Sequence, residues 1–368
     1  MIDILVIPYR DIYFWDRYGP AVRDLQIIEE LSQLEVIKNI SVLNRPVSIY
    51  ERFFNKNKRK FDYIKGVDIF DSTSFELFGP LKKRAWTVSC YDAFIRECVS
   101  TCLSKSNNKL VVLDFTPFAI LPISDNERVF YWHDMIDNFT KHNCFSEYEK
   151  NLVSNKYRYV ADHYSYMTSV SNVAANEVLK YKELNYSVLP NGLFYGEKNN
   201  QPSVCSEESY HFGFVGFVTD KFDIDFVSYL AKKFDVVVYG EVYDDSVKNK
   251  LLSCGVSVKG AFSYQELPKL IATFKVGLLP YLSEKSHDGS PLKLYEYLKY
   301  NKPCLTSINY EYSNEFIVNY NESLNVGEDI ERLFEVTGKE CISERLPESI
   351  KLSDYVKKSL LSSGFLGV

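Results

Sequence analysis

Short apolar runs alternate with amphipathic stretches along the second half of the chain, and this alternation constrains the fold more than any other feature. The apolar runs have the length of strands, while the amphipathic stretches carry apolar residues at helical spacing. Parallel strands need crossover connections, which helices supply, so the pattern predicts a doubly wound α/β domain. The expected strands are 211–215, 235–239, 256–259, 276–280 and 304–307, and the expected helices are 225–233, 245–254, 264–274 and 291–300.

The first half shows the same alternation in a less regular form. We expect strands at 2–8, 109–115, 128–132 and 187–190 and one that ends at residue 171, with helices at 23–34, 173–180 and 351–361. The segment 196–209 is polar and lacks hydrophobic periodicity, so we expect a linker there. The length of 368 residues allows about two domains. We therefore expect Rossmann-like domains at 1–195 and 210–345, and a final helix within 346–368 that packs back on the N-terminal domain.

Composition excludes several classes of protein. Hydrophobic residues make up 46% of the chain and charged residues 25%, as in a folded globular protein. Lys and Arg total 43 against 49 Asp and Glu, and the net charge of −6 argues against a nucleic-acid partner. The eight cysteines form no Cys-x-x-Cys pair, which argues against a zinc site and favours a reducing compartment. No apolar run approaches about 20 residues and the N-terminus lacks a basic signal region, so we expect a cytoplasmic protein.

The segment 290–298 is the strongest candidate for a binding site. Ser290 is a good N-cap and Pro291 suits the first helical turn, so the helix would present free backbone N–H groups to an anion. Lys293 is unfavourable in a first turn unless an anion such as phosphate binds there. Glu296 lies one turn on, where it can accept hydrogen bonds from a ribose diol. The alternative is an ordinary capped helix with a surface lysine.

Gly216 follows the first expected strand of the second half. A glycine at a strand end lets a ligand approach the backbone closely. The segment 213–218 does not match the G-x-G-x-x-G fingerprint, and a plain turn is the alternative.

A cluster of titratable residues follows the strand expected at 128–132 and should therefore lie at the carboxyl edge of the first sheet. A reaction that deprotonates a substrate hydroxyl needs a general base, and Asp is a suitable residue type. Asp137 is the first candidate for this role, ahead of Asp134 and His133. The alternative is that Asp137 or Asn138 caps a helix.

Two features of the first half are further candidates for binding surfaces. Basic and aromatic residues at 53–61 and 82–86 favour contact with an anionic membrane surface, with a solvated loop as the alternative. Four residues follow the first strand and are expected to line the acceptor side of a cleft, with a structural loop as the alternative: Arg10, Asp11, Trp15 and Arg17.

Taken in order, the motifs of the second half resemble those of GT-B glycosyltransferases of the family 4 type. They are FVG at 214–216, GVSVKG at 255–260, ELP at 266–268, VGLLP at 276–280, SPLKLYEYL at 290–298 and NKPC at 301–304. The first half resembles the teichuronic-acid and xanthan-type glucuronosyltransferases at HDMIDNF (133–139), AD (161–162), VS (170–171) and VLPNG (188–192). The resemblance covers about residues 130–308, and residues 1–125 match only in layout.

The resemblance implies two Rossmann-like domains that face each other across a cleft, with a UDP-sugar held by the C-terminal domain. The diphosphate would meet Lys293 and the backbone N–H groups of Leu292 and Lys293, and the ribose would meet Glu296. Asp137 would deprotonate the acceptor hydroxyl. The residues expected around the donor are Gly216, Phe217, Gly260, Ala261, Phe262, Asp288, Ser290, Pro291, Leu292, Lys293 and Glu296.

Some positions depart from the family pattern. Asp288 stands where retaining members carry the first Glu of Glu-x7-Glu, so inverting and retaining transfer both stay open. Asn301 replaces a glycine, and Asn tolerates the left-handed conformation expected at a helix C-terminus. We expect no metal or cofactor, because Lys293 and the helix dipole can neutralise the diphosphate. Asp223 and Asp225 resemble a metal motif, but we expect Asp225 to be an N-cap.

The sequence thus predicts a glycosyltransferase of bacterial surface polysaccharide synthesis, such as capsule or O-antigen. It would move a sugar from a nucleoside-diphosphate donor to a glycan or lipid-linked glycan, in the cytoplasm or at the inner face of the membrane. One alternative is a catalytically silent subunit of the same fold that binds a partner glycosyltransferase or a glycan. The other is a nucleotide-sugar epimerase.

Overall fold

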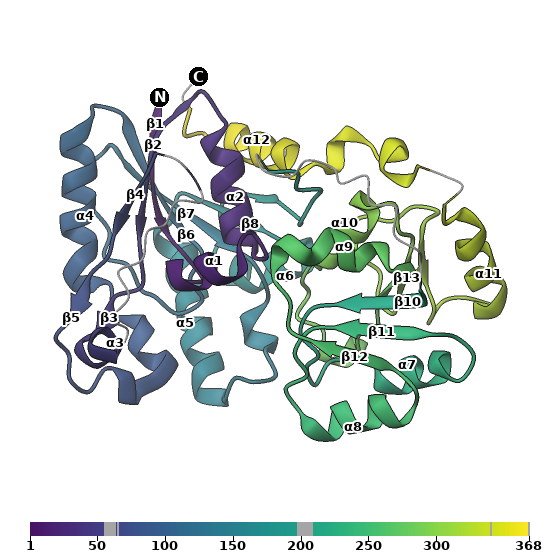
Figure 1. Cartoon of the computed structure of the whole chain (residues 1–368). Coiled ribbons are helices and arrows are strands. Elements are labelled where there is room, and N and C mark those ends of the chain that lie inside the picture. Colours follow the sequence, from purple (N-terminus) through teal and green to yellow (C-terminus); the bar gives the residue numbers. More distant parts are fainter. Residues whose placement is uncertain (55–63, 65, 197–208, 339–340, 367–368) are drawn as a thin grey trace. The chain divides into compact units, whose positions relative to one another are not determined.

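The computed structural model describes residues 1–54, 64, 66–196, 209–338 and 341–366, and Figure 1 shows its helices and strands. The chain forms two compact units, which are described one at a time. Unit 1 comprises Met1–Pro190, His287–Gly289 and Ser353–Val368, and unit 2 comprises Asn191–Ser286 and Ser290–Leu352. The basic stretch expected at 53–61, beyond residue 54, and most of the linker expected at 196–209 lie outside the described residues.

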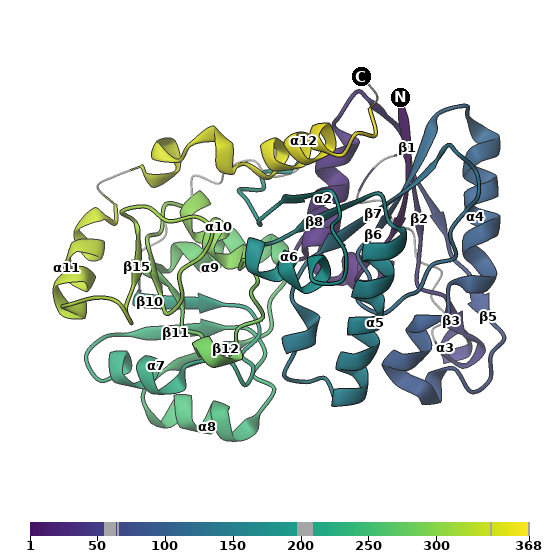
Figure 2. The same ribbon diagram turned by 180° about the vertical axis from the view of Figure 1, so that it is seen from behind.

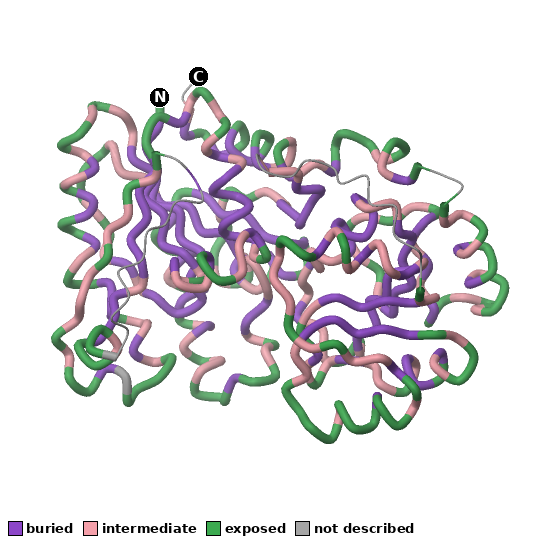
Figure 3. Tube along the Cα trace, in the orientation of Figure 1, coloured by how far each residue is buried: buried purple, intermediate pink, exposed green. Residues whose placement is uncertain are grey.

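Unit 1 is built on a seven-stranded parallel sheet with the order β4-β2-β1-β6-β7-β8-β9. All six residues of β1 are buried, as expected for a parallel sheet that is covered on both faces (Figure 3). The strand order reverses between β1 and β6. The strands are β1 (Ile2–Ile7), β2 (Ile37–Leu43), β4 (Val67–Phe70), β6 (Lys109–Asp114), β7 (Val129–Met135), β8 (Tyr166–Ser169) and β9 (Tyr186–Val188).

Helices cover both faces of this sheet. Leu5 of β1 packs into a core cluster with residues of three helices, α4, α5 and α6. On the other face, Trp132 of β7 packs against Phe365, which follows α12. The helices of unit 1 are α1 (Ile12–Tyr18), α2 (Arg23–Ser32), α3 (Ile49–Phe54), α4 (Asp92–Lys105), α5 (Glu147–His163), α6 (Asn172–Leu179) and α12 (Leu352–Ser362), with 3-10 turns η1 (Pro80–Val88) and η2 (Phe139–Lys141) and a small β3 (Val47–Ser48)–β5 (Thr73–Ser74) sheet.

Unit 2 has a six-stranded parallel sheet with the order β12-β11-β10-β13-β14-β15, the 3-2-1-4-5-6 order of a dinucleotide-binding domain. Its strands are β10 (Tyr210–Val215), β11 (Val236–Tyr239), β12 (Ser257–Gly260), β13 (Phe274–Leu279), β14 (Cys304–Thr306) and β15 (Ile317–Asn319). Its helices are α7 (Ile224–Ala231), α8 (Asp245–Ser253), α9 (Leu267–Ala272), α10 (Leu292–Lys299) and α11 (Val326–Val336), with 3-10 turns η3 (Tyr264–Glu266), η4 (Ser283–Lys285), η5 (Ile342–Arg345) and η6 (Glu348–Ile350). No helix among the described residues is long and apolar enough to cross a membrane.

The expected elements agree well with the structure in the second half and less well in the first. The alternation between residues 210 and 307 yields the predicted strands and helices, with ends shifted by a few residues. The first half also contains elements that the sequence did not predict: β2, β3, β4, β5, α1, α3, α4 and α5. In α4 the buried positions are Ile95, Cys98, Val99 and Cys102, so half of the apolar face is made of cysteine.

The seven cysteines that the structure describes are free thiols, and Cys205 lies outside the described residues. Burial raises the pKa of Cys90 and of Cys98 to about 12. Cys144 in unit 1 and Cys341 in unit 2 are exposed.

Candidate functional site

The candidate binding site of unit 2 lies where the strand order reverses, between β10 and β13. Chain connections leave these two strands in opposite directions, so their carboxyl ends border a crevice that suits a ligand. Gly216 directly follows β10, and the segment that leads into α10 follows β13. The structure therefore places two of the predicted motifs, Gly216 and the segment 290–298, at the switch point.

Gly216 makes room for the side chain of Lys293. Its φ of 126° lies in a region that favours glycine, and a Cβ there would lie 2.2 Å from Cε of Lys293. Gly240 lies against the backbone of Gly216, because a Cβ added to Gly240 would lie 1.9 Å from the carbonyl oxygen of Gly216. The close approach that the sequence predicted at Gly216 is therefore used by a lysine side chain.

Lys293 has no carboxylate within ion-pair distance among the residues that the structure describes. Its Nζ lies 5.3 Å from the ring centroid of Phe214 and 5.9 Å from that of Tyr281, so aromatic rings are its neighbours. Burial lowers the pKa of Lys293 to about 8. A cation in these surroundings gains stabilisation from an anionic ligand.

The N-terminus of α10 differs from the prediction in its cap. The helix begins at Leu292, and Pro291 occupies the N-cap position without a side-chain capping bond. Ser290 is therefore not the N-cap, contrary to the prediction. Its Oγ is buried and has no hydrogen-bond partner within the described part of the chain, while its carbonyl accepts a hydrogen bond from Nδ2 of Asn191. An anion at this helix N-terminus would give the buried hydroxyl and the first backbone N–H groups of α10 hydrogen-bond partners.

One carboxylate oxygen of Glu296 accepts no hydrogen bond from the described residues. Glu296 is only 7% exposed, and its Oε1 accepts a hydrogen bond of 2.6 Å from the hydroxyl of Tyr264. Oε2 has no hydrogen-bond partner among the described residues and lies 4.0 Å from Nζ of Lys299. Burial raises the pKa of Glu296. A diol that donates to Oε2 would satisfy this oxygen.

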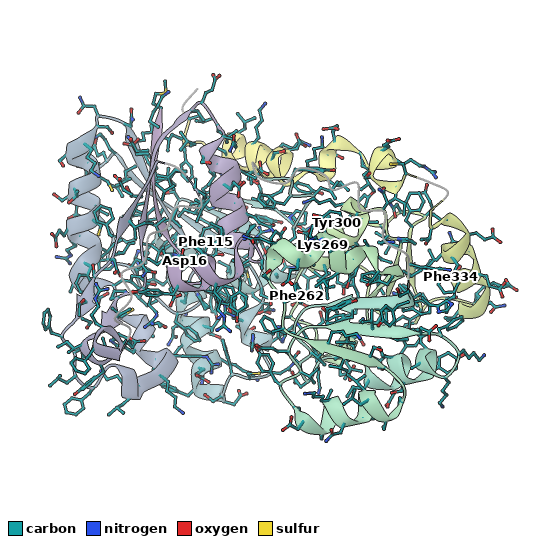
Figure 4. All side chains as sticks on the ribbon, in the orientation of Figure 1. Asp16, Phe115, Phe262, Lys269, Tyr300 and Phe334 are labelled. Atoms are coloured by element: carbon teal, nitrogen blue, oxygen red, sulfur yellow. The ribbon has the colours of Figure 1, made fainter. Side chains whose placement is uncertain are left out.

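Aromatic side chains lie at the same edge of the sheet. Gly260 ends β12 with a φ of 81°, followed by exposed Ala261 and half-buried Phe262, which Figure 4 labels among the side chains of unit 2. Phe217, 40% exposed, stacks on Tyr243 with ring centroids 5.5 Å apart. The ring of Phe262 or that of Phe217 can provide a stacking surface for a base.

Unit 1 holds a pair of titratable side chains, Asp137 and His287. Asp137 follows β7 and is partly exposed, and its Oδ2 lies 3.5 Å from Nδ1 of the buried His287. The backbone N–H of Asn138 donates to the carbonyl of His287 at 2.9 Å. A Cβ on Gly289 would lie 2.5 Å from Oδ1 of Asp137, so a larger residue at 289 would have to shift this carboxylate. The sequence analysis did not single out His287, although it is the neighbour of Asp288.

Asp288 holds this short segment in place within unit 1. Its φ is 57°, and its carboxylate accepts hydrogen bonds from Nδ2 of Asn138 at 2.8 Å and from Nζ of Lys141 at 2.9 Å. Its carbonyl accepts a hydrogen bond of 2.8 Å from Oγ of Ser171. These contacts position His287 beside Asp137.

Asp134 and His133 lie within β7, further into the strand than predicted. Both carboxylate oxygens of Asp134 bind the guanidinium of Arg23, at 2.8 and 3.0 Å. His133 is 2% exposed, and burial lowers its pKa to about 4. The ion pair gives Asp134 a structural role, and burial leaves both side chains little access to a ligand. Asn138 is an N-cap, but only of the short 3-10 turn η2, where its side chain accepts from the N–H of Thr140. The helix that contains Tyr148, α5, has Ser146 as its N-cap.

The residues expected on the acceptor side surround the first helix of unit 1. Asp11 is the N-cap of α1 and accepts from the N–H of Phe14 at 2.9 Å. Trp15 is buried, and its Nε1 donates to Asp24 at 3.4 Å. Arg10 and Arg17 are exposed, so these two remain accessible to a ligand.

The Asp223–Asp225 pair has structural roles. Asp223 caps α7 by accepting from the N–H of Phe226, whereas Asp225 forms an ion pair with Lys250 at 2.6 Å. The prediction that Asp225 is the N-cap is therefore wrong by two residues, because the helix starts earlier. Within the described part of the chain, no three acidic, histidine or cysteine side chains are grouped as in a metal site.

The fold is that of the GT-B glycosyltransferases, which confirms the α/β fold class expected from the sequence. The glycosyltransferase AviGT4, involved in avilamycin A biosynthesis, matches with a TM-score of 0.58 and 12% identity, over 100% of this chain and 98% of AviGT4. TarM matches with a TM-score of 0.51 and 13% identity, over 72% of this chain and 57% of TarM, so the chain spans little more than half of TarM. No protein-family model matches the sequence, and no curated protein does.

Proposed function

We propose that the chain is a glycosyltransferase that binds a nucleoside-diphosphate sugar at the switch point of unit 2. The observation that carries the proposal is Lys293, a cation with aromatic neighbours and no carboxylate partner among the described residues. The unpartnered hydroxyl of Ser290 and the N-terminus of α10 adjoin it in sequence. Together they favour an anion with several oxygen atoms, such as a diphosphate. The fold shared with AviGT4 supports this assignment.

The remaining contacts of the donor follow from the same edge of the sheet. Oε2 of Glu296 accepts a hydrogen bond from the ribose, and Phe262 or Phe217 stacks on the base. The resemblance of the motifs to family 4 enzymes favours UDP as the nucleotide. Lys293 and the N–H groups of α10 supply the positive charge that a metal supplies in other transferases, so the proposed reaction uses no metal.

In the proposed reaction, the bond between the anomeric carbon and the diphosphate oxygen breaks, and the acceptor oxygen bonds to that carbon. The proton of the acceptor hydroxyl moves to Asp137, which His287 adjoins at 3.5 Å. The leaving diphosphate gains a negative charge, which Lys293 stabilises. Asp137 is favoured over Asp134 and His133 because its carboxylate is partly exposed, whereas those two side chains are buried.

The proposed acceptor is a glycan or lipid-linked glycan, and the proposed role is synthesis of a bacterial surface polysaccharide in the cytoplasm. The motif resemblance in both halves of the chain supports this role. Exposed Arg10 and Arg17 offer cationic groups to an anionic acceptor.

Nucleotide binding is tested by the thermal stability of the full chain with UDP, GDP, ADP, CMP and their sugars. A ligand at about 100 times its Kd stabilises a protein by roughly 2.7 kcal/mol, which is a visible shift. We expect one nucleotide to stabilise the wild type and the Lys269→Ala variant, since Lys269 belongs to α9 and lies outside the proposed site, but not Lys293→Ala. No shift with any nucleotide, or an equal shift in both variants, would contradict the proposed donor site.

Catalysis is tested separately with the stabilising nucleotide sugar. We expect slow donor hydrolysis by the wild type and transfer once an acceptor is added. Asp137→Asn should keep the nucleotide shift and lose transfer. A silent subunit would bind without hydrolysis or transfer, whereas an epimerase would convert the sugar and keep the nucleotide attached.

A further inference from the structure

Unit 1 exposes several large apolar side chains on neighbouring elements, here called the apolar surface. Phe75, Phe78 and Leu81 expose 80%, 69% and 77% of their area. These residues follow β5, which pairs with β3, and α3 packs against both strands (Figures 1 and 2). Single apolar residues on a surface are ordinary, but a group of them marks an interaction site. The apolar surface comprises Tyr50, Phe53, Phe75, Leu77, Phe78 and Leu81, each at least half exposed.

The segment that carries these side chains is held by a buried tryptophan. Trp86 of η1 is 3% exposed, and its Nε1 donates to Glu76 at 2.9 Å. Gly79 lies against the indole, because a Cβ there would lie 2.5 Å from Nε1. Two backbone hydrogen bonds close the turn, from Leu81 to Phe78 at 3.2 Å and from Lys82 to Gly79 at 2.9 Å. The apolar side chains are therefore displayed outward by an anchored turn.

Basic residues adjoin the apolar surface directly. Lys82, Lys83 and Arg84 follow Leu81, and all three are exposed. Lys82 pairs with Glu76 at 2.7 Å and Arg84 with Glu149 at 3.1 Å. Lys83 has no carboxylate within 4.0 Å among the described residues, and its φ of 50° marks a sharp turn there. From 75 to 84, Glu76 is the single acidic residue against three basic ones.

We infer that the apolar surface docks unit 1 on an anionic lipid bilayer. Aromatic and aliphatic side chains insert at the boundary between headgroups and acyl chains, and adjoining lysine and arginine bind anionic headgroups. The net charge of −6 makes the whole chain repel such a membrane, so the local basic group fixes which face approaches it. A symmetric contact between two copies would place Lys82, Lys83 and Arg84 against themselves, which disfavours self-association through this surface.

The test is co-sedimentation of the full chain with phosphatidylcholine vesicles that do or do not contain phosphatidylglycerol. The wild type should bind the anionic vesicles and bind the neutral ones weakly. Phe75→Ser/Phe78→Ser/Leu81→Ser should bind the anionic vesicles at least about tenfold more weakly, and Lys83→Glu should lose most of the preference for anionic lipid. Leu324→Ser/Leu361→Ser removes two exposed leucines elsewhere and should bind like the wild type.

Failure of this inference is distinguishable from failure of the proposed function, because vesicle binding needs neither donor nor acceptor. An unchanged thermal transition of the triple variant shows that it is folded. Absence of wild-type binding to anionic vesicles, or equal binding by the triple variant, would overturn the inference. A wild-type dimer that the triple variant converts to monomers would overturn it as well, in favour of a self-association surface.

Discussion

Asp134→Asn is expected to destabilise unit 1 strongly, whereas Asp137→Asn, three residues on, is expected to leave its stability nearly unchanged. Asp134 is 1% exposed and Arg23 is 5% exposed, so the ion pair between them is buried. The carboxylate also accepts a hydrogen bond of 2.6 Å from Oγ1 of Thr168. An amide in place of this carboxylate would remove the negative charge that faces the buried guanidinium.

Removing one partner of a buried ion pair costs about 3–5 kcal/mol. The introduced amide would keep one acceptor oxygen, so we expect the lower end of that range, about 3 kcal/mol. For a unit of this size each kcal/mol lowers the Tm by about 2–4 °C, which gives roughly 6–12 °C. The Asp137 side chain is 29% exposed and lies 3.5 Å from an imidazole, so its loss should cost less than about 1 kcal/mol.

The assay is thermal and urea unfolding of both variants, with transfer measured well below both transitions. A double variant, Arg23→Met/Asp134→Leu, replaces the pair by apolar groups and should recover much of the lost stability, since the buried cation is gone as well. We expect Asp134→Asn to retain transfer at low temperature and Asp137→Asn to lose it. Wild-type stability in Asp134→Asn, combined with lost transfer, would refute a structural role for this carboxylate.

Three further outcomes are expected. Gly216→Ala places a methyl group 2.2 Å from Cε of Lys293 and should weaken UDP binding by at least about tenfold, as measured by calorimetry. The control is Gly255→Ala, which also has a positive φ, of 89°, but no atom within 4 Å, and which should leave UDP binding unchanged. Donor affinity should be constant below pH 8 and fall above it, because burial lowers the pKa of Lys293 to about 8 and the donor requires the ammonium form; a pH-independent Kd would contradict this. The pKa of His133 is lowered from 6.5 to about 4, so as the pH falls this imidazole takes up a proton in the unfolded chain before it does so in the folded chain. The free energy of unfolding should therefore fall by up to about 3 kcal/mol as the pH drops from 6.5 to 4. His133→Gln should flatten that part of the urea-unfolding profile relative to the wild type.

Local signals in the sequence predicted much of unit 2. The strand-helix alternation and the glycine at the end of β10 follow from neighbouring residues, and both appear in the structure. The prediction that Asn301 adopts a left-handed conformation is confirmed by its φ of 60°. The caps were harder to place: Ser290 lies two residues before the first residue of α10, and Asp225 lies two residues after the N-cap of α7, although both are suitable residue types.

Contacts between distant residues could not be predicted in this way. His287 meets Asp137 across 150 residues of sequence, and Arg23 meets Asp134 across 111. No local pattern distinguishes Asp134 from Asp137; the difference arises because β7 continues to Met135 and buries the first carboxylate. One sheet neighbour of β1, β6, was predicted, whereas the other, β2, was missed. In β2 the exposed Lys38 and Asn39 follow the first residue, so the strand lacks a continuous apolar run.

The distribution of thiols gives the chain a natural pair of spectroscopic labelling sites. Maleimides react with thiolates, so the buried cysteines with raised pKa, such as Cys90 and Cys98, should stay unmodified at neutral pH. Exposed Cys144 lies in unit 1 and exposed Cys341 in unit 2. Once Cys205 and Cys254 are replaced by Ser, a fluorophore or spin label on each remaining reactive thiol reports one distance between the units. That distance, followed during titration with a nucleotide sugar, measures any domain movement that accompanies donor binding.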